Sequence, residues 1–148
     1  MHTLVFVTVS ADRTTSSKEV CSKVFCDLVT EGFVHPGWLT GGWGDWFVIG
    51  GRWSGELARR LGRPDIGGDH PNAIGQDDDA GIVTREVYDA CLKPFEDECQ
   101  VRPSWESDGL PGFIDLNAEE VSPETHIAPA EGDDAGTVKW LVVVDLHD

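Results

Sequence analysis

Residues 4–9 read LVFVTV and residues 140–144 read WLVVV. Both stretches consist almost wholly of β-branched, aromatic and aliphatic residues, which is a composition typical of β-strands. A strand without an alternating polar side usually lies in the middle of a sheet. Because the two stretches lie near opposite ends of the chain, we predict that the first and last strands form the centre of one sheet.

The residues that follow the first stretch predict a helix. Ser16 and Glu19 have the Ser-x-x-Glu spacing of a capping box, in which two backbone N–H groups at a helix start are satisfied by side chains. Apolar residues then recur at helical spacing and define the face that we expect to be buried: Val20, Cys21, Val24, Phe25, Leu28 and Val29. Gly32 suits the left-handed position at which many helices end.

The second half of the chain predicts shorter elements. Residues 56–61 suit a short helix. Another helix is expected to begin near Thr84 and to kink or restart at Pro94, because proline removes a helical hydrogen bond. Residues 113–116 are a strand candidate and residues 125–129 a weaker one. The buried face of the helix after Thr84 is expected to hold Val87, Tyr88, Cys91 and Leu92.

The order of these elements favours a single α+β domain that spans residues 1–148. We predict a mixed or antiparallel sheet with two helices on one face, in a ferredoxin-like or related arrangement. Residues 64–81 are rich in Gly, Asp and Pro. They are predicted to form a long acidic surface loop.

The net charge of the chain is −16, and its distribution is uneven. Residues 64–148 carry 21 of the 27 acids and four of the 11 bases, whereas residues 1–63 are close to neutral. Binding to nucleic acid requires Lys or Arg to replace the counterions of the phosphates. We therefore expect no direct binding to nucleic acid, and a basic protein partner, or no electrostatic partner at all, fits the charge better.

The sequence also indicates where the protein is located. It contains no run of roughly 18 apolar residues that could span a membrane, and its start lacks the features of a signal peptide. We therefore predict a cytoplasmic protein without a membrane partner. Its four Cys residues are expected to be reduced, and Cys21 and Cys91 lie on apolar helical stripes that predict burial in the core.

A search for established motifs finds no catalytic, metal or nucleotide signature. The Gly-rich segment near Gly50 lacks the Lys of a phosphate-binding loop, and Ser54 lacks the flanking glycines of a nucleophile elbow. The five His residues are scattered, and no pair has the spacing of a helical metal site. We therefore predict no metal site and no cofactor, and the sequence assigns no catalytic residue.

Residues 45–55, which read DWFVIGGRWSG, are different. Two consecutive glycines inside a strand indicate a bulge or the close approach of another group. Trp46 and Trp53 beside these glycines offer flat surfaces for a planar ligand or for a partner's side chain. Arg52 can grip a carboxylate or phosphate at two points, and Asp45 is its expected internal partner. Alternatively, both indoles belong to the core and Asp45 with Arg52 is a structural ion pair.

The same segment resembles a Trp-Asp-Trp-aromatic-x-Ile-Gly-Gly-Arg-Trp-x-Gly motif found in a family of bacteriophage and prophage proteins. Members of this family tend to end in Val-Asp-x-His, as residues 144–147 do here. The chain departs from the pattern at Gly44, where the family usually has Trp, and in its acidic second half. The resemblance implies a phage-encoded accessory protein in the host-cell cytoplasm, and it implies no particular activity.

Three functional hypotheses follow. The first is a phage accessory protein that binds a host protein or a small anionic or planar ligand. The second is an acidic mimic of nucleic acid that inhibits a host DNA-binding protein. The third is a small hydrolase or nucleotide-processing enzyme with an Arg for the anionic substrate and a His or Asp as general base. The candidate ligand-binding or partner-binding residues are Asp45, Trp46, Arg52, Trp53, His126, Asp145 and His147.

Overall fold

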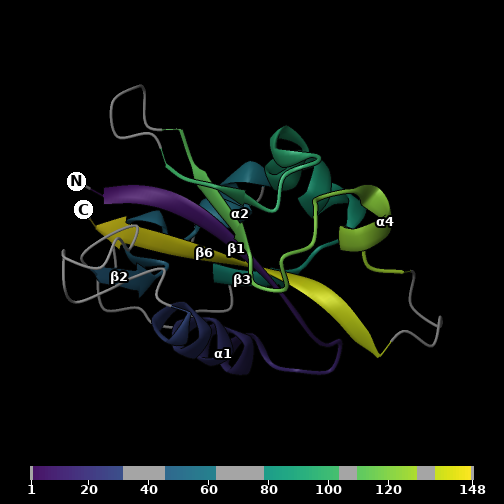
Figure 1. Ribbon diagram of the computed structural model, residues 1–148, viewed down its shortest axis with the longest axis horizontal. Coiled ribbons are helices and arrows are strands. Elements are labelled where there is room, and N and C mark those ends of the chain that lie inside the picture. Colours follow the sequence, from purple (N-terminus) through teal and green to yellow (C-terminus); the bar gives the residue numbers. More distant parts are fainter. Residues whose placement is uncertain (1, 32–45, 63–78, 104–109, 130–135, 148) are drawn as a thin grey trace.

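The two long strands β1 (His2–Asp12) and β6 (Thr137–His147) pair antiparallel along their whole length, from His2 opposite His147 to Asp12 opposite Thr137. The computed structural model describes residues 2–31, 46–62, 79–103, 110–129 and 136–147. The start of β1 therefore lies beside the end of β6 (Figure 1). The prediction that the two apolar stretches form the centre of one sheet is confirmed.

Four shorter strands complete a six-stranded mixed sheet with the order β2-β6-β1-β5-β4. β5 (Gly112–Asp115) runs parallel to β1, and β4 (Gln100–Val101) pairs antiparallel with β5. β2 (Trp46–Ile49) and β3 (Ala80–Ile82) both pair with the outer edge of β6, one after the other along its length. The α+β class and the mixed sheet are as predicted, whereas β3 and β4 were not expected.

Helices cover both faces of this sheet. One core cluster joins α1 (Ser17–Thr30) to the side chains of β1 and β6 that include Val5, Val7, Val142 and Val144. The other joins Leu4, Phe6, Leu141 and Val143 to the helical segments of the second half. In Figure 1, α1 lies below the sheet and α2 (Glu56–Arg60) above it. The prediction of two helices on one face is wrong, because strands that are apolar on both sides require a cover on both sides.

The cap and core of α1 follow the sequence pattern, but its buried stripe is narrower than expected. The Ser16 side chain accepts a hydrogen bond from the Glu19 N–H at 3.2 Å, as the capping box predicts. Val20, Cys21, Val24 and Leu28 are buried. Phe25 and Val29 are 43% and 51% exposed, so their predicted burial is wrong. Both lie one position beyond the buried stripe, about 100° around the helix from it.

The helix predicted near Thr84 forms as three consecutive helical turns. α3 (Arg85–Val87) is capped by the Thr84 hydroxyl, and it continues as the π-helical turn η4 (Tyr88–Leu92). The 3-10 turn η5 (Lys93–Phe95) contains Pro94, so the predicted restart at this proline is confirmed. The four side chains expected in the core are buried: Val87, Tyr88, Cys91 and Leu92. No helix in the described part of the chain has the length and apolar character to cross a bilayer.

Residues 125–129 do not form the predicted strand. Residues Pro123–His126 form the short helix α4 instead, and Ile127 follows as its C-cap. Ser122 and Thr125 make a reciprocal capping box, and Pro123 occupies the first helical position, where a missing N–H has no cost. These local contacts outweigh the strand propensity of Thr125 and Ile127.

The predicted acidic loop at 64–81 is wrong at its last three residues. Asp79 is fully buried, and Ala80 and Gly81 belong to β3. This segment is held because β3 pairs with β6 from Ala80 opposite Val142 to Ile82 opposite Trp140. The rest of the predicted loop, up to residue 78, lies outside the described residues and stays a prediction.

The buried and exposed sides of α1 give a direct test of which of its residues belong to the core. We predict that Val24→Ala lowers the free energy of unfolding by about 2 kcal/mol, because it leaves a cavity in the core. Val29→Ala, the matched control on the same helix, is expected to change it by less than about 0.5 kcal/mol, because Val29 is half exposed. Urea denaturation followed by circular dichroism measures both. Equal losses would contradict the assignment.

Candidate functional site

Three aromatic side chains meet at the end of the sheet where β1 begins and β6 ends. The register places both His2 and Trp46 opposite His147. The Trp46 indole stacks on the His147 ring with centroids 4.6 Å apart and planes 7° from parallel. The His2 ring stands edge-on to both, at 5.4 Å from Trp46 and 5.1 Å from His147. We call His2, Trp46 and His147 the aromatic cluster.

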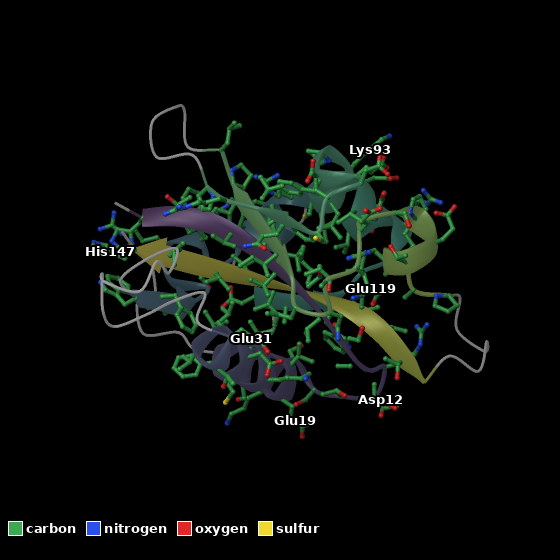
Figure 2. All side chains as sticks on the ribbon, viewed as in Figure 1. Asp12, Glu19, Glu31, Lys93, Glu119 and His147 are labelled. Atoms are coloured by element: carbon green, nitrogen blue, oxygen red, sulfur yellow. The ribbon has the colours of Figure 1, made fainter. Side chains whose placement is uncertain are left out.

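The aromatic cluster is open on one side. The Trp46 side chain is 43% exposed, although it is held by the pairing of β2 with β6 and by its stacking on His147. Figure 2 shows His147 at the end of the sheet, beside the start of β1. A rigid and exposed indole at a strand end is a surface that can stack against a planar group without a loss of side-chain freedom.

Asp145 holds the aromatic cluster in place through a contact with His2. Its side chain is almost fully buried, and its Oδ1 lies 2.9 Å from Nδ1 of His2. Its Oδ2 accepts a hydrogen bond of 3.0 Å from the backbone N–H of Arg52. The carboxylate therefore links β6 to the first residue of β1 and to the segment after β2. With both oxygens engaged, Asp145 positions His2 and the backbone of Arg52.

Gly50 and Gly51 allow this arrangement. Both have positive φ, at 76° and 54°, a conformation that residues with a side chain adopt rarely. A Cβ atom on Gly51 would lie 2.6 Å from Oδ2 of Asp145, and one on Gly50 would collide with the carboxylate of Asp79. The chain then turns into η2 (Gly51–Trp53). The sequence predicted the close approach of another group at these glycines, and the groups are two buried carboxylates.

The structure brings together four of the seven candidate residues: Trp46, Arg52, Asp145 and His147. Arg52 joins through its backbone, and its side chain is exposed. Trp53 is half buried and packs on the second core cluster, so the core interpretation holds for it. Asp45 lies outside the described residues. His2 was missed, although antiparallel pairing of the two terminal strands would have placed it opposite His147.

His126 lies elsewhere. It is fully buried at the other end of the sheet, with Nε2 2.7 Å from Oδ2 of Asp115 and Nδ1 2.8 Å from the hydroxyl of Thr125. Lys139 of β6 contacts the same carboxylate at 2.8 Å. Lys139 and Asp145 are six positions apart on β6, which is about 20 Å of extended strand. The assignment of His126 to the same site as His147 is therefore wrong.

The carboxylate of Asp115 is paired with basic side chains inside the protein. Burial alone would raise the pKa of Asp115, but hydrogen bonds from His126, Lys139 and the Asn117 N–H outweigh it and hold the pKa below its ordinary value. Lys139 also reaches Glu119 at 2.9 Å. In Figure 2, Glu119 lies to the right of the centre of the molecule and His147 at its left end. We interpret the group around Asp115 as a buried ion-pair network that fixes α4 to the sheet.

Neither a metal site nor a relative identifies the function. Within the described ranges, no three His, Cys, Asp or Glu residues are arranged to hold a metal ion. Comparison of the chain with protein-family models, with curated proteins and with solved structures found no match. The case for the site therefore depends on its geometry.

The glycine contacts predict a large difference between two substitutions. We expect Gly51→Ala to lower the free energy of unfolding by about 3 kcal/mol, because its Cβ would displace the Asp145 carboxylate. Gly62→Ala is the control: Gly62 also has positive φ, but a Cβ there meets nothing within 4 Å. Its cost is expected to be about 1 kcal/mol, from backbone strain alone. Thermal unfolding measures both, and equal costs would contradict the close approach.

The Asp115 network predicts how stability depends on pH. Because its folded-state pKa lies below the value in the unfolded chain, the ionised carboxylate contributes stability above about pH 4, and this contribution is lost as the pH falls through the folded-state pKa. Between about pH 6 and pH 3, wild type should lose more stability than Asp115→Asn. Urea unfolding across this range tests it. Asp27→Asn, at an exposed ion pair, should keep the wild-type dependence.

Proposed function

We propose that this protein acts by binding, and that it engages a host protein or a small ligand through the aromatic cluster and the neighbouring Arg52. The observation that carries the proposal is the Trp46 indole, which is ordered by stacking on His147 and yet 43% exposed. Trp is enriched at binding surfaces, because its large ring supplies an apolar face and its N–H a polar contact. The resemblance of residues 45–55 to phage proteins supports an accessory protein of phage origin.

Binding fits the site better than catalysis does. The hydrolase hypothesis requires its candidate residues in one pocket, and His126 lies at the far end of the sheet from His147. Asp145 is buried, and both of its oxygens are engaged by His2 and by the Arg52 N–H. These contacts fix the shape of the surface, and they leave the exposed indole and the exposed guanidinium to meet a partner.

The chemistry of the surface favours a planar, negatively charged group. An aromatic or heterocyclic ring can stack on Trp46, as the His147 ring does on its other side. A carboxylate or phosphate on that ring can be held by the planar fork of Arg52. The same combination suits an aromatic acid or an aromatic side chain next to an acid on a protein.

A titration with small planar acids tests this proposal. The ¹⁵N-labelled protein would be mixed with indole-3-acetate and with adenosine monophosphate, and the indole N–H signal of Trp46 would be followed by NMR. We expect this signal to shift. Arg52→Gln should weaken binding about tenfold, because the charge-assisted contact is lost while the backbone N–H to Asp145 remains. Arg85→Gln, which removes an exposed arginine elsewhere, should leave it unchanged.

A host partner is tested by capture from host lysate with immobilised protein. Trp46→Ala should lose the captured protein, whereas Phe25→Ala, which removes an aromatic side chain that is also 43% exposed, should retain it. Retention by Trp46→Ala together with an unshifted indole signal in both titrations would overturn the proposed site. Loss of the partner on addition of DNA or high salt in both variants would favour nucleic-acid mimicry instead.

A further inference from the structure

We propose that the protein has a second ligand site, a cavity of about 620 Å³ that takes a small carboxylic acid with an apolar body. The cavity lies between the end of α2, the η4–η5 segment and the strands β4 and β5. Its volume is within the range of pockets that hold small molecules. None of the residues that line it belongs to the aromatic cluster, so this inference does not depend on the proposed function.

The inner wall of the cavity is apolar. Cys91 and Phe95 are buried beneath it, at 1% and 7% exposure, and Val101 and Pro111 flank them. Burial raises the pKa of the Cys91 thiol to about 11, so the thiol is neutral at physiological pH. Leu110, the most exposed of the large apolar side chains described, stands at the edge at 60%. Such a wall favours a hydrocarbon or aromatic body.

Two arginines, Arg60 and Arg102, are the basic residues among the described residues that line the cavity. Arg60 lies with its guanidinium 5.0 Å above the Phe6 ring, and its Nε donates to Glu56. This arrangement orients Arg60 while its terminal nitrogens carry no hydrogen bond within the described structure. Arg102 also lines the cavity, and it forms no ion pair with a described residue. Glu98 is the acid among the described lining residues.

The described lining of this cavity holds two arginines and one glutamate, and Arg60 is also ion-paired with Glu56, so Arg102 is the cation that is left for a ligand. The chain carries a net charge of −16, and residues 64–148 contain four bases. One of these four, Arg102, converges with Arg60 on an apolar cavity. A single carboxylate complements the Arg102 guanidinium, because Arg60 is already paired with Glu56, and an apolar body complements the wall behind it. A neutral ligand would gain only the apolar contacts.

Titration with octanoate and with octanol tests the site. Followed by ¹H–¹⁵N NMR, octanoate is expected to shift the backbone amide signals of Cys91, Phe95 and Val101, and octanol to bind at least about tenfold more weakly. Arg102→Gln should weaken octanoate binding about tenfold. Because Arg102 is exposed and has no hydrogen bond or ion pair with a described residue, this variant should fold normally. Arg85→Gln, with the same change in charge at an exposed pair with Asp89, should bind as wild type does.

Four outcomes would overturn the inference. One is the absence of shifts at these amides up to the solubility limit of octanoate. Another is equal affinity for octanol and octanoate, or an Arg102→Gln variant that binds as tightly as wild type, because either result would remove the role of the arginines. The last is a short peptide ending in Leu that shifts the same amides while octanoate does not, because the cavity would then hold a protein chain end.

Discussion

The pairing of β1 with β6 is the constraint on which the rest of the structure depends. The two strands are paired from His2–His147 to Asp12–Thr137, so one register decides which face every side chain takes. A slip of one residue would turn Leu4 and Phe6 away from their core cluster and would carry Asp145 away from His2. The same pairing creates the exposed aromatic cluster at one end and the buried Asp115 network at the other.

Composition and local chemistry predicted the elements that carry strong patterns. The apolar terminal strands, the Ser16 cap of α1, the capped helix after Thr84 and its restart at Pro94 all follow from neighbouring residues. β3 and β4 have three and two residues, too few for an alternation to be seen, and they exist because a neighbouring strand offers hydrogen bonds. The placement of helices on both faces was implied by strands that are apolar on both sides, but the element order favoured a two-layer arrangement.

The candidate site was predicted only in part, because its contacts join residues that are far apart in the sequence. Consecutive glycines indicated that something approaches the backbone at Gly50 and Gly51, but the approaching carboxylates are distant in sequence. The Arg52 N–H and Asp145 are 93 residues apart, and His2 and Asp145 are 143 apart. Only the register of the sheet reveals such contacts. His126 was grouped with His147 by residue type, and the length of β6 separates them.

The central claim is that Trp46 is both ordered and open to solvent. Paramagnetic relaxation by a soluble, uncharged gadolinium chelate measures this directly, with the indole N–H of Trp140, which is 6% exposed, as an internal reference. The structure predicts strong relaxation of the Trp46 indole, weak relaxation of the Trp140 indole, and nuclear Overhauser contacts from Trp46 to the His2 and His147 rings. A Trp46 indole as protected as that of Trp140, or one without contacts to either histidine, would contradict the account.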